Sequence, residues 1–360
     1  MKKYCKYKKT FFALVFGAVI ILLLSGCVND NLILTPTPAV PTVDSTAQAT
    51  GVNPPVPTPN AEEEIHFSDV RLENIVRDTI GKNIGPIKIS DVDEITKFSA
   101  RVEGILNIDG LQYFKSLEEL DLYGNRISDI TPIANLTSLK KLNLGKNYNI
   151  LTAGSSKANG LDISPIKGLI LLEELDLSDN MITNLEGVGY LPALTTLILK
   201  GNRVSDISVL SGCKSLVYVD LSYNYGLNSD NSEQGIVDLS PLYGISSIET
   251  LIAGYNLIEN VSGIEVMENL SYLDLSGNFI SEVAHINKLQ KIETVILHYN
   301  ALVSIEGFRK NSTIKNLDVS QNLITHFDVI LTMNALETLN WSQNNIQDYR
   351  PIEKFEEKIE

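Results

Sequence analysis

One asparagine-centred pattern recurs through most of the chain and constrains the fold more than any other feature. Its plainest copy runs from Lys115 to Leu136 and carries Leu120 and Leu122 ahead of Asn125. Seven of the nine intervals between successive pattern asparagines are 22 residues, and the other two are 33 and 32. Ten copies at a nearly constant period indicate structural units that stack on one another. The asparagines are Asn125, Asn147, Asn180, Asn202, Asn224, Asn256, Asn278, Asn300, Asn322 and Asn344.

Each copy combines a strand-like half and a turn-like half. In Leu273-Asp274-Leu275 the apolar residues alternate with period two, which predicts inward leucines and an outward aspartate. Apolar residues then follow the asparagine at +2, +5 and +8, a spacing that suits short 3₁₀ turns. The asparagine falls at the turn, where its amide can satisfy buried backbone groups, so stacked copies should form an asparagine ladder.

The pattern L-x-x-L-x-L-x-x-N-x-I/L is the leucine-rich-repeat signature. We therefore predict an α/β solenoid: a curved right-handed leucine-rich-repeat coil with a parallel β-sheet on its concave side. The convex side should be 3₁₀ or irregular. About eleven repeats are expected over residues 93–355, including a degenerate first copy in which Glu103 replaces the asparagine. The long intervals insert polar runs at 149–160 and 226–235, which we expect to be loops protruding from one edge.

Both ends of the repeat array carry sequences that suit caps. Residues 61–92 predict an N-terminal helical cap whose first helix ends at Gly81, with a second short helix beginning at Ser90. At the other end, Trp341 replaces the second strand leucine and is expected to seal the last coil, followed by a charged tail at 356–360. The apolar face of the first cap helix comprises Leu72, Ile75, Val76 and Ile80.

The N-terminus resembles the signal peptide of a bacterial lipoprotein. A lysine-rich start and an apolar run precede Leu24-Ser25-Gly26-Cys27, which matches the lipobox. The resemblance implies a signal peptide over 1–26, cleavage after Gly26 and a diacylglyceryl group on Cys27. Two acyl chains hold a protein on a bilayer durably. An ordinary signal peptide with an incidental cysteine, or an uncleaved signal anchor, are the alternatives.

Residues 27–60 join the lipidated cysteine to the cap. Their dense prolines and threonines predict a disordered, extended stalk. The expected location is the outer face of the cytoplasmic membrane, at the surface of a Gram-positive cell.

A more specific likeness appears from the cap onward. The helical cap, the segment Ile105-Leu-Asn-Ile-Asp-Gly-Leu-Gln-Tyr-Phe114 and repeats of the form L-D-L-S/Y-x-N-x-I-S-D-I-x-P-L/I resemble bacterial internalins over residues 61–355. The resemblance implies a surface-held protein that binds a protein partner through its concave face. The sequence departs from the family because no immunoglobulin-like domain and no sorting signal follow the repeats. Binding as a mode is therefore carried over, and host-cell adhesion is not.

The predicted concave face has one apolar region. From Asp176 to Asp318 one outward column alternates aspartate with isoleucine, beside a column that contains two tyrosines. Exposed aromatic and aliphatic residues favour a protein-binding patch, although such residues also simply suit strands. The candidate partner-binding residues are Ile198, Tyr218, Ile252, Tyr272, Ile296, His298, Tyr223, Tyr255 and Tyr299.

Charge and composition exclude several other functions. Removing the signal peptide takes away five lysines and no acidic residue, so the net charge falls from −15 to −20. This acidity argues against nucleic-acid binding. Aspartates in alternate repeats would lie about 9–10 Å apart, too far to share a metal ion. We expect no metal and no cofactor.

The sequence also gives no sign of catalysis. Its four histidines show no recognisable catalytic spacing, and no phosphate-binding loop or metal motif is present. Cys213 occupies a repeat-closing leucine position and is expected to be a buried small hydrophobe, with a redox or catalytic thiol as the alternative. We therefore predict a monomeric, lipid-anchored binding protein rather than an enzyme. The alternatives are a passive structural component of the envelope and an accessory subunit of a secreted enzyme or transporter.

Overall fold

The computed structural model describes residues 60–147, 160–227 and 233–359. The repeats and their caps belong to one compact unit, Thr58–Glu360. The predicted signal peptide, Cys27, the stalk and nearly all of the 149–160 insertion lie outside the described residues. Within the described part of the chain, no helix has both the length and the apolar character needed to span a membrane.

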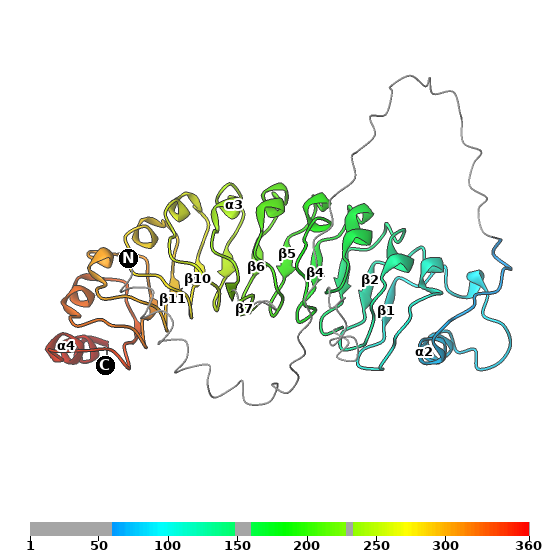
Figure 1. The fold of residues 1–360 in the computed structure, drawn as a ribbon, viewed down its shortest axis with the longest axis horizontal. Helices are drawn as coiled ribbons and strands as arrows, with labels where there is room; N and C mark the ends of the chain where they lie inside the picture. The colour runs from blue at the N-terminus through cyan, green and yellow to red at the C-terminus, as the bar shows by residue number, and fades with distance from the viewer. Residues whose placement is uncertain (1–59, 148–159, 228–232, 360) are drawn as a thin grey trace, which may run out of the picture. The chain divides into compact units, whose positions relative to one another are not determined.

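Eleven short strands form one parallel sheet along the inner side of the repeat array (Figure 1). Each strand pairs with the next in an unbroken register, because every repeat contributes the same three positions. The copy that lacks the asparagine supplies the first strand of this sheet. The strands are β1 (Lys97–Ser99), β2 (Glu119–Asp121), β3 (Lys141–Asn143), β4 (Glu174–Asp176), β5 (Thr196–Ile198), β6 (Tyr218–Asp220), β9 (Thr250–Ile252), β10 (Tyr272–Asp274), β11 (Thr294–Ile296), β12 (Asn316–Asp318) and β13 (Thr338–Asn340).

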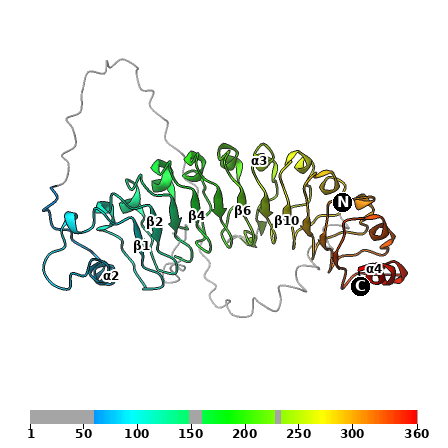
Figure 2. The same ribbon diagram turned by 180° about the vertical axis from the view of Figure 1, so that it is seen from behind.

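The opposite side of each coil is built mainly from 3₁₀ turns, as the three-residue apolar spacing predicts (Figure 2). One repeat differs, since its turn α3 (Ser240–Tyr243) is α-helical. The 3₁₀ turns are η3 (Leu111–Tyr113), η4 (Thr131–Ile133), η6 (Ser164–Gly168), η7 (Val188–Tyr190), η8 (Ser208–Gly212), η9 (Ile264–Val266), η10 (Ile286–Lys288), η11 (Glu306–Phe308) and η12 (Asp328–Thr332).

The N-terminal helix α2 (Val70–Ile80) lies where the sequence predicts it, and it buries Leu72 and Val76. Gly81 ends the helix in the left-handed conformation, with φ of 66°. Asp69 caps its start by accepting from Arg71 N at 2.9 Å, and it also accepts from Leu106 N in the first repeat at 2.8 Å. One carboxylate thus joins the helix to the solenoid. Burial is the largest single effect and raises the pKa of Asp69, but these two bonds and the Arg71 charge together outweigh it and hold the pKa below its usual value.

The expected second cap helix is corrected by the structure. It is a single 3₁₀ turn, η2 (Ile89–Asp91), and it begins one residue earlier than Ser90. Its start is held by Asp91 Oδ2, which accepts from Lys88 N at 2.7 Å and from Lys82 Nζ at 2.6 Å. The side chain that caps this turn is therefore Asp91, whereas the sequence pattern predicted a cap formed by Ser90 and Asp93.

The C-terminal prediction is also corrected. The expected charged tail continues an α-helix, α4 (Arg350–Ile359), which packs against η12. Ile352 and Phe355 on this helix are buried. Trp341 is only partly buried, and its ring meets Tyr349 edge-to-face at 5.8 Å between centroids. The last coil is thus covered by a helix as well as by the indole.

The second insertion is more ordered than a plain loop. Its two ends pair as a short antiparallel ribbon, β7 (Gly226–Leu227) with β8 (Glu233–Gln234). The intervening residues 228–232 are not described.

Ten asparagines line the interior as a continuous ladder. Each side-chain nitrogen donates to carbonyl oxygens of its own coil and of the preceding coil, as Asn224 Nδ2 does to Leu221 O at 2.8 Å and Leu199 O at 3.1 Å. Asn224 Oδ1 accepts from Val204 N at 2.9 Å. Cys213 is fully buried, as expected of a small hydrophobe, and burial raises the pKa of its thiol to about 11.

Candidate functional site

Two columns of side chains face outward along the sheet. In each strand the middle residue is buried or nearly so, while the first and third residues point away from the core. The observed register aligns Tyr218 and Tyr272 in the first column, with Thr250 between them. It aligns Ile198, Asp220 and Ile252 in the third column. The columns deduced from the repeat period are therefore the columns of the structure.

The acidic and amide residues of the third column have a structural function. Each accepts the backbone N–H two residues onward, as Asp274 Oδ1 does from Ser276 N at 2.8 Å. The bond closes the turn that leaves the strand. The same bond is made by Asp121, Asn143, Asp176, Asp220, Asp318 and Asn340. A sequence signal for this function exists, because Ser or Gly stands two residues after most of these positions.

Three repeats carry isoleucine in place of the turn-closing aspartate or asparagine. Ile198, Ile252 and Ile296 occupy the third column, where an aliphatic side chain cannot accept a hydrogen bond. All three remain partly exposed. The structural preference of the column is for aspartate or asparagine, so strand propensity alone does not account for these isoleucines.

At the strand ends, Tyr223, Tyr255 and His298 form a preorganised aromatic shelf. The Tyr223 and Tyr255 rings stack with centroids 4.4 Å apart and planes 11° apart. Tyr255 Oη lies 3.2 Å from His298 Nε2. Fixed rings of this kind lose little conformational entropy when a partner binds.

The shelf tyrosines share a left-handed backbone conformation that the residue before each ladder asparagine adopts. Tyr223, Tyr255 and Tyr299 precede ladder asparagines and have φ of 58°, 57° and 58°. Bulky residues rarely adopt this left-handed conformation. Glycine fills the same position in three other copies, and Gly277 makes room for the shelf, since a Cβ there would lie 2.7 Å from Cδ1 of Tyr255. Those glycines are the sequence signal that reveals the conformation.

Tyr299 lies next to the shelf and is only partly exposed. Its burial, with a smaller contribution from Tyr255, raises its pKa to about 12. All nine predicted partner-binding residues thus lie on the sheet face or at the strand ends, over β5 to β11. We call this set the apolar patch: Ile198, Tyr218, Tyr223, Ile252, Tyr255, Tyr272, Ile296, His298 and Tyr299.

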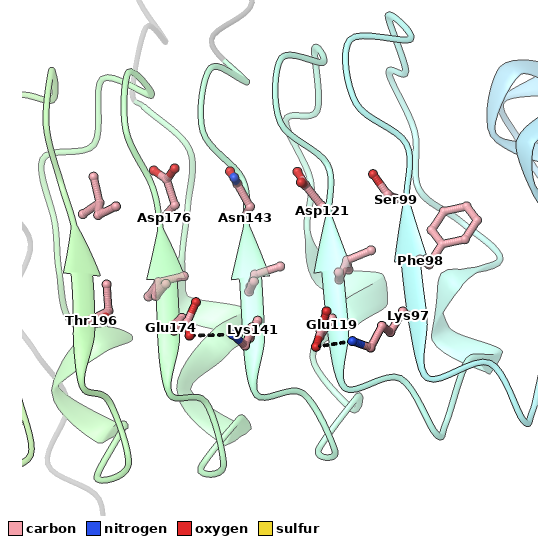
Figure 3. A pocket seen from close by; sticks show the side chains of 14 residues that line it. Lys97, Phe98, Ser99, Glu119, Asp121, Lys141, Asn143, Glu174, Asp176 and Thr196 are labelled. Carbon is pink, nitrogen blue, oxygen red and sulfur yellow. Dashed lines mark hydrogen bonds and ion pairs between the residues drawn. The ribbon is translucent and has the colours of Figure 1, made fainter.

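A hollow of the sheet face lies over β1 to β5 and meets the apolar patch at Ile198 (Figure 3). It has a volume of about 560 Å³, and charged, polar and apolar side chains line it. Lys97 pairs with Glu119 at 2.8 Å, and Lys141 pairs with Glu174 at 2.6 Å. Several outward side chains of the hollow are tied to one another in ion pairs, whereas the patch carries isoleucine and tyrosine at the corresponding positions. Sequence reasoning did not single out this hollow.

One further cluster joins two neighbouring coils. His285 Nδ1 lies 3.0 Å from Glu265 Oε2, and His285 Nε2 lies 3.2 Å from Ser262 Oγ. Serine, histidine and glutamate thus come together although the sequence shows no catalytic spacing. Ser262 Oγ also donates to Asn260 Oδ1 at 2.6 Å, and Gly263 N donates to Glu265. The Ser262 hydroxyl and the Gly263 N–H thus both donate to acceptors inside the cluster. Because the cluster joins residues of two neighbouring coils, we call it a clasp.

Metal binding gains no support from the geometry. Across residues 60–147, 160–227 and 233–359, no group of three His, Cys, Asp or Glu side chains is placed to hold a metal ion.

Fold, ladder and register together define a leucine-rich-repeat solenoid protein, a class whose members act in protein–protein interaction. A model of leucine-rich repeats in two copies matches residues 115–155 and 170–210. Internalin C2 of Listeria monocytogenes is 32% identical in sequence, with a TM-score of 0.57, and the match covers 64% of this chain and 94% of the internalin. The chain belongs to the internalin-like leucine-rich-repeat proteins.

Relatives in animals share the repeats. Rabbit lumican is 33% identical over 164 residues, which are 45% of this chain and 77% of lumican. The bovine leucine-rich repeat-containing protein 23 is 25% identical over 208 residues, 54% of this chain. This chain spans 57% of the length of that bovine protein.

Proposed function

We propose that this chain is an extracellular, lipid-anchored leucine-rich-repeat protein that binds a protein partner through its apolar patch. The observation that carries the proposal is the replacement of the turn-closing Asp or Asn by isoleucine at Ile198, Ile252 and Ile296. Each replacement gives up a backbone hydrogen bond and places aliphatic surface beside a tyrosine. This exchange supports a binding function, because it costs the fold a hydrogen bond.

The rest of the patch has the character of a binding hot spot. Tyr218 and Tyr272 flank Ile252 from the two neighbouring strands. Tyrosine is enriched at the centres of protein interfaces, where it offers a large apolar ring and a polar hydroxyl. The shelf extends this surface along the strand ends. Its rings are held by the stacking of Tyr223 on Tyr255 and by the hydrogen bond between Tyr255 and His298.

The membrane anchor is proposed from the sequence of the N-terminus. Leu24-Ser25-Gly26-Cys27 follows an apolar run with a lysine-rich start, and Cys27 would carry the diacylglyceryl group. The proposed site of action is the outer face of the cytoplasmic membrane.

A double variant tests the patch. Ile252→Lys together with Tyr272→Glu places two charges at its centre while leaving the core, the ladder and the turn bonds untouched. We expect the affinity for a partner captured by the native protein to fall at least about thirtyfold, because truncating or charging one hot-spot residue costs about 2 kcal/mol or more. Surface plasmon resonance with the purified partner would measure the change.

The matched control carries the same chemistry on the other side of the coil. Tyr190 on η7 and Val266 on η9 are 57% and 54% exposed. Val266→Lys with Tyr190→Glu should therefore leave the affinity within twofold of the native value. Circular dichroism would establish that both double variants are folded. Equal loss in both, or loss in neither, would contradict the proposed site.

The anchor is tested separately. Cys27→Ser should abolish incorporation of labelled palmitate and release the protein from the membrane fraction, because the serine hydroxyl does not accept the lipid. Cys5→Ser changes another cysteine of the same N-terminal region and should leave both properties intact. Continued labelling of the Cys27→Ser variant would rule out this attachment site.

A further inference from the structure

The two halves of the exposed sheet face differ in how many of their outward carboxylates form ion pairs. Over β1 to β4, three of the four outward carboxylates are paired with cations of the chain itself, while Asp176 on β4 has no ion pair within the described residues. Glu119 has Lys97, Glu174 has Lys141, and Asp121 has Arg101 at 2.5 Å. Most of the acidic charge on the N-terminal half of the face is therefore balanced by cations of the chain itself.

The half that carries the apolar patch is not compensated in this way. Within the described residues, Asp220, Asp274 and Asp318 have no ion pair with a lysine, arginine or histidine. Asp220 is only 8% exposed, and its hydrogen bonds come from the neutral groups Ser222 N and Ser222 Oγ. A poorly solvated carboxylate without a counter-charge is costly, and an incoming cation would relieve that cost.

The tyrosines differ in the same way between the N-terminal half of the face and the centre of the patch. Tyr123, at the end of β2, has Arg101 over its ring at 4.5 Å and Lys146 at 5.7 Å. Tyr223, at the edge of the patch, has Lys200 at 5.4 Å. At the centre of the patch, no cation of the described chain lies over Tyr218 or Tyr272. Burial, and then the neighbouring aspartate, raises the pKa of each of these two hydroxyls.

We infer that the occupant of the apolar patch is a cationic protein segment, in which lysine or arginine side chains alternate with apolar ones. This inference rests on the proposed function and deepens it. The segment's cations would pair with Asp220 and Asp274 and lie against Tyr218 and Tyr272, as Arg101 lies against Asp121 and Tyr123 within the chain. Its apolar side chains would contact Ile252 and Ile296.

The positions of Asp220 and Asp274 also set the spacing expected between the basic side chains of the segment. Asp220 and Asp274 lie on strands separated by β9, so they are about 9–10 Å apart at the usual strand spacing. Two basic side chains at that separation, with an apolar residue between them over Ile252, would satisfy both carboxylates. The chain's own net charge of −15 favours the approach of such a segment.

A displayed library of random 12-residue peptides tests the inference and does not require the natural partner to be identified. The full chain, solubilised in detergent and immobilised, serves as bait. Peptides that also bind the Ile252→Thr/Tyr272→Thr variant are discarded, because attraction to the acidic surface as a whole would survive that change. We expect the remaining peptides to be enriched in lysine and arginine interspersed with apolar residues.

A charge-only variant makes the test sharper. Asp220→Asn with Asp274→Asn removes two charges but keeps the turn-closing bond, since Asn143 makes that bond to Gly145 N at 2.9 Å in the same column. The affinity of the selected peptides should fall about tenfold. The matched control, Asp206→Asn with Asp238→Asn, removes two charges from similar turns on the other side of the coil and should change the affinity less than twofold.

The outcomes separate the two proposals. Neutral or acidic peptides that depend on the patch, or basic ones that are indifferent to Asp220→Asn/Asp274→Asn, would overturn the cationic partner and leave the binding function standing. A selection that returns no patch-dependent peptide would overturn both.

Discussion

At the scale of the residue, the molecule is organised by polar groups placed where a core normally excludes them. The asparagine amide has an acceptor and two donors, which match the unpaired carbonyl and N–H groups of adjoining coils. Asn224 shows the complete set, with its oxygen on Val204 N and its nitrogen on Leu199 O and Leu221 O. The ladder thus replaces the backbone pairing that a tight turn cannot supply.

Removing one amide of the ladder should therefore be costly. Asn224 is fully buried, and Asn224→Ala would leave one N–H and two carbonyl oxygens without these partners. We expect the free energy of unfolding to fall by about 3 kcal/mol. Urea denaturation followed by circular dichroism would measure it. Asn184→Ala removes an exposed amide that accepts from Glu186 N at 2.9 Å, and it should cost less than about 1 kcal/mol. Equal losses in the two variants would contradict this account of the ladder.

Single positions also show the limit of sequence reasoning. The outward columns follow from the 22-residue period, because a fixed period leaves only one register. The left-handed backbone at Tyr223, Tyr255 and Tyr299 does not follow from these residues, since tyrosine normally avoids it. Only a comparison with Gly124, Gly201 and Gly277, which fill the same position in other copies, would have revealed it.

At the scale of the element, the strands and 3₁₀ turns are those that the sequence predicts, and the differences lie at the ends. The three-residue apolar spacing gives 3₁₀ turns in most coils that are followed by another coil. After Tyr349 the backbone leaves the coil and continues into α4, with Asp348 Oδ1 accepting from Arg350 N at 3.0 Å. The Ser262–His285–Glu265 clasp was equally hidden, because it joins residues about one repeat apart in sequence.

This clasp predicts a pH dependence. The backbone N–H of Glu265 is the largest cause that lowers its pKa, the bond to His285 and the Gly263 N–H add to it, and the pKa falls to about 2. A carboxyl whose pKa is depressed by folding stabilises the fold above its unfolded pKa, near 4.5. That contribution is lost as the pH falls from about 4.5 towards 2.

Glu265→Gln should accordingly reduce the loss of stability between pH 4.5 and pH 2. The measurement is the free energy of unfolding in urea at several pH values across this range. Glu268→Gln removes the charge of an exposed neighbour and provides the control. A pH profile of the Glu265→Gln variant that parallels the native profile would show that the clasp does not contribute.

At the scale of the whole molecule, stability passes from coil to coil. Each repeat buries its leucines only against its neighbours, so the first and last coils need a cover. At the N-terminal end α2 buries Leu72 and Val76 and is tied to the first repeat through Asp69. At the C-terminal end α4 buries Ile352 and Phe355. The patch lies over β5 to β11, away from both covers, where the sheet is most constrained by neighbours on either side.

Weakening one cover should therefore uncouple the end of the array from its middle. Phe355 is 3% exposed on α4, and Phe355→Ala should remove about 3 kcal/mol from the packing of the last coil. The chain contains one tryptophan, Trp341, which lies in that coil and contacts Tyr349. Tryptophan fluorescence thus reports the C-terminal end, and far-ultraviolet circular dichroism reports the whole solenoid. In the variant the fluorescence transition should occur at lower urea than the dichroism transition. Glu357→Ala, exposed on the same helix, should leave the two transitions as they are in the native chain. If the Phe355→Ala transitions move together instead, the array unfolds as a single cooperative unit and α4 stabilises the distant patch as well.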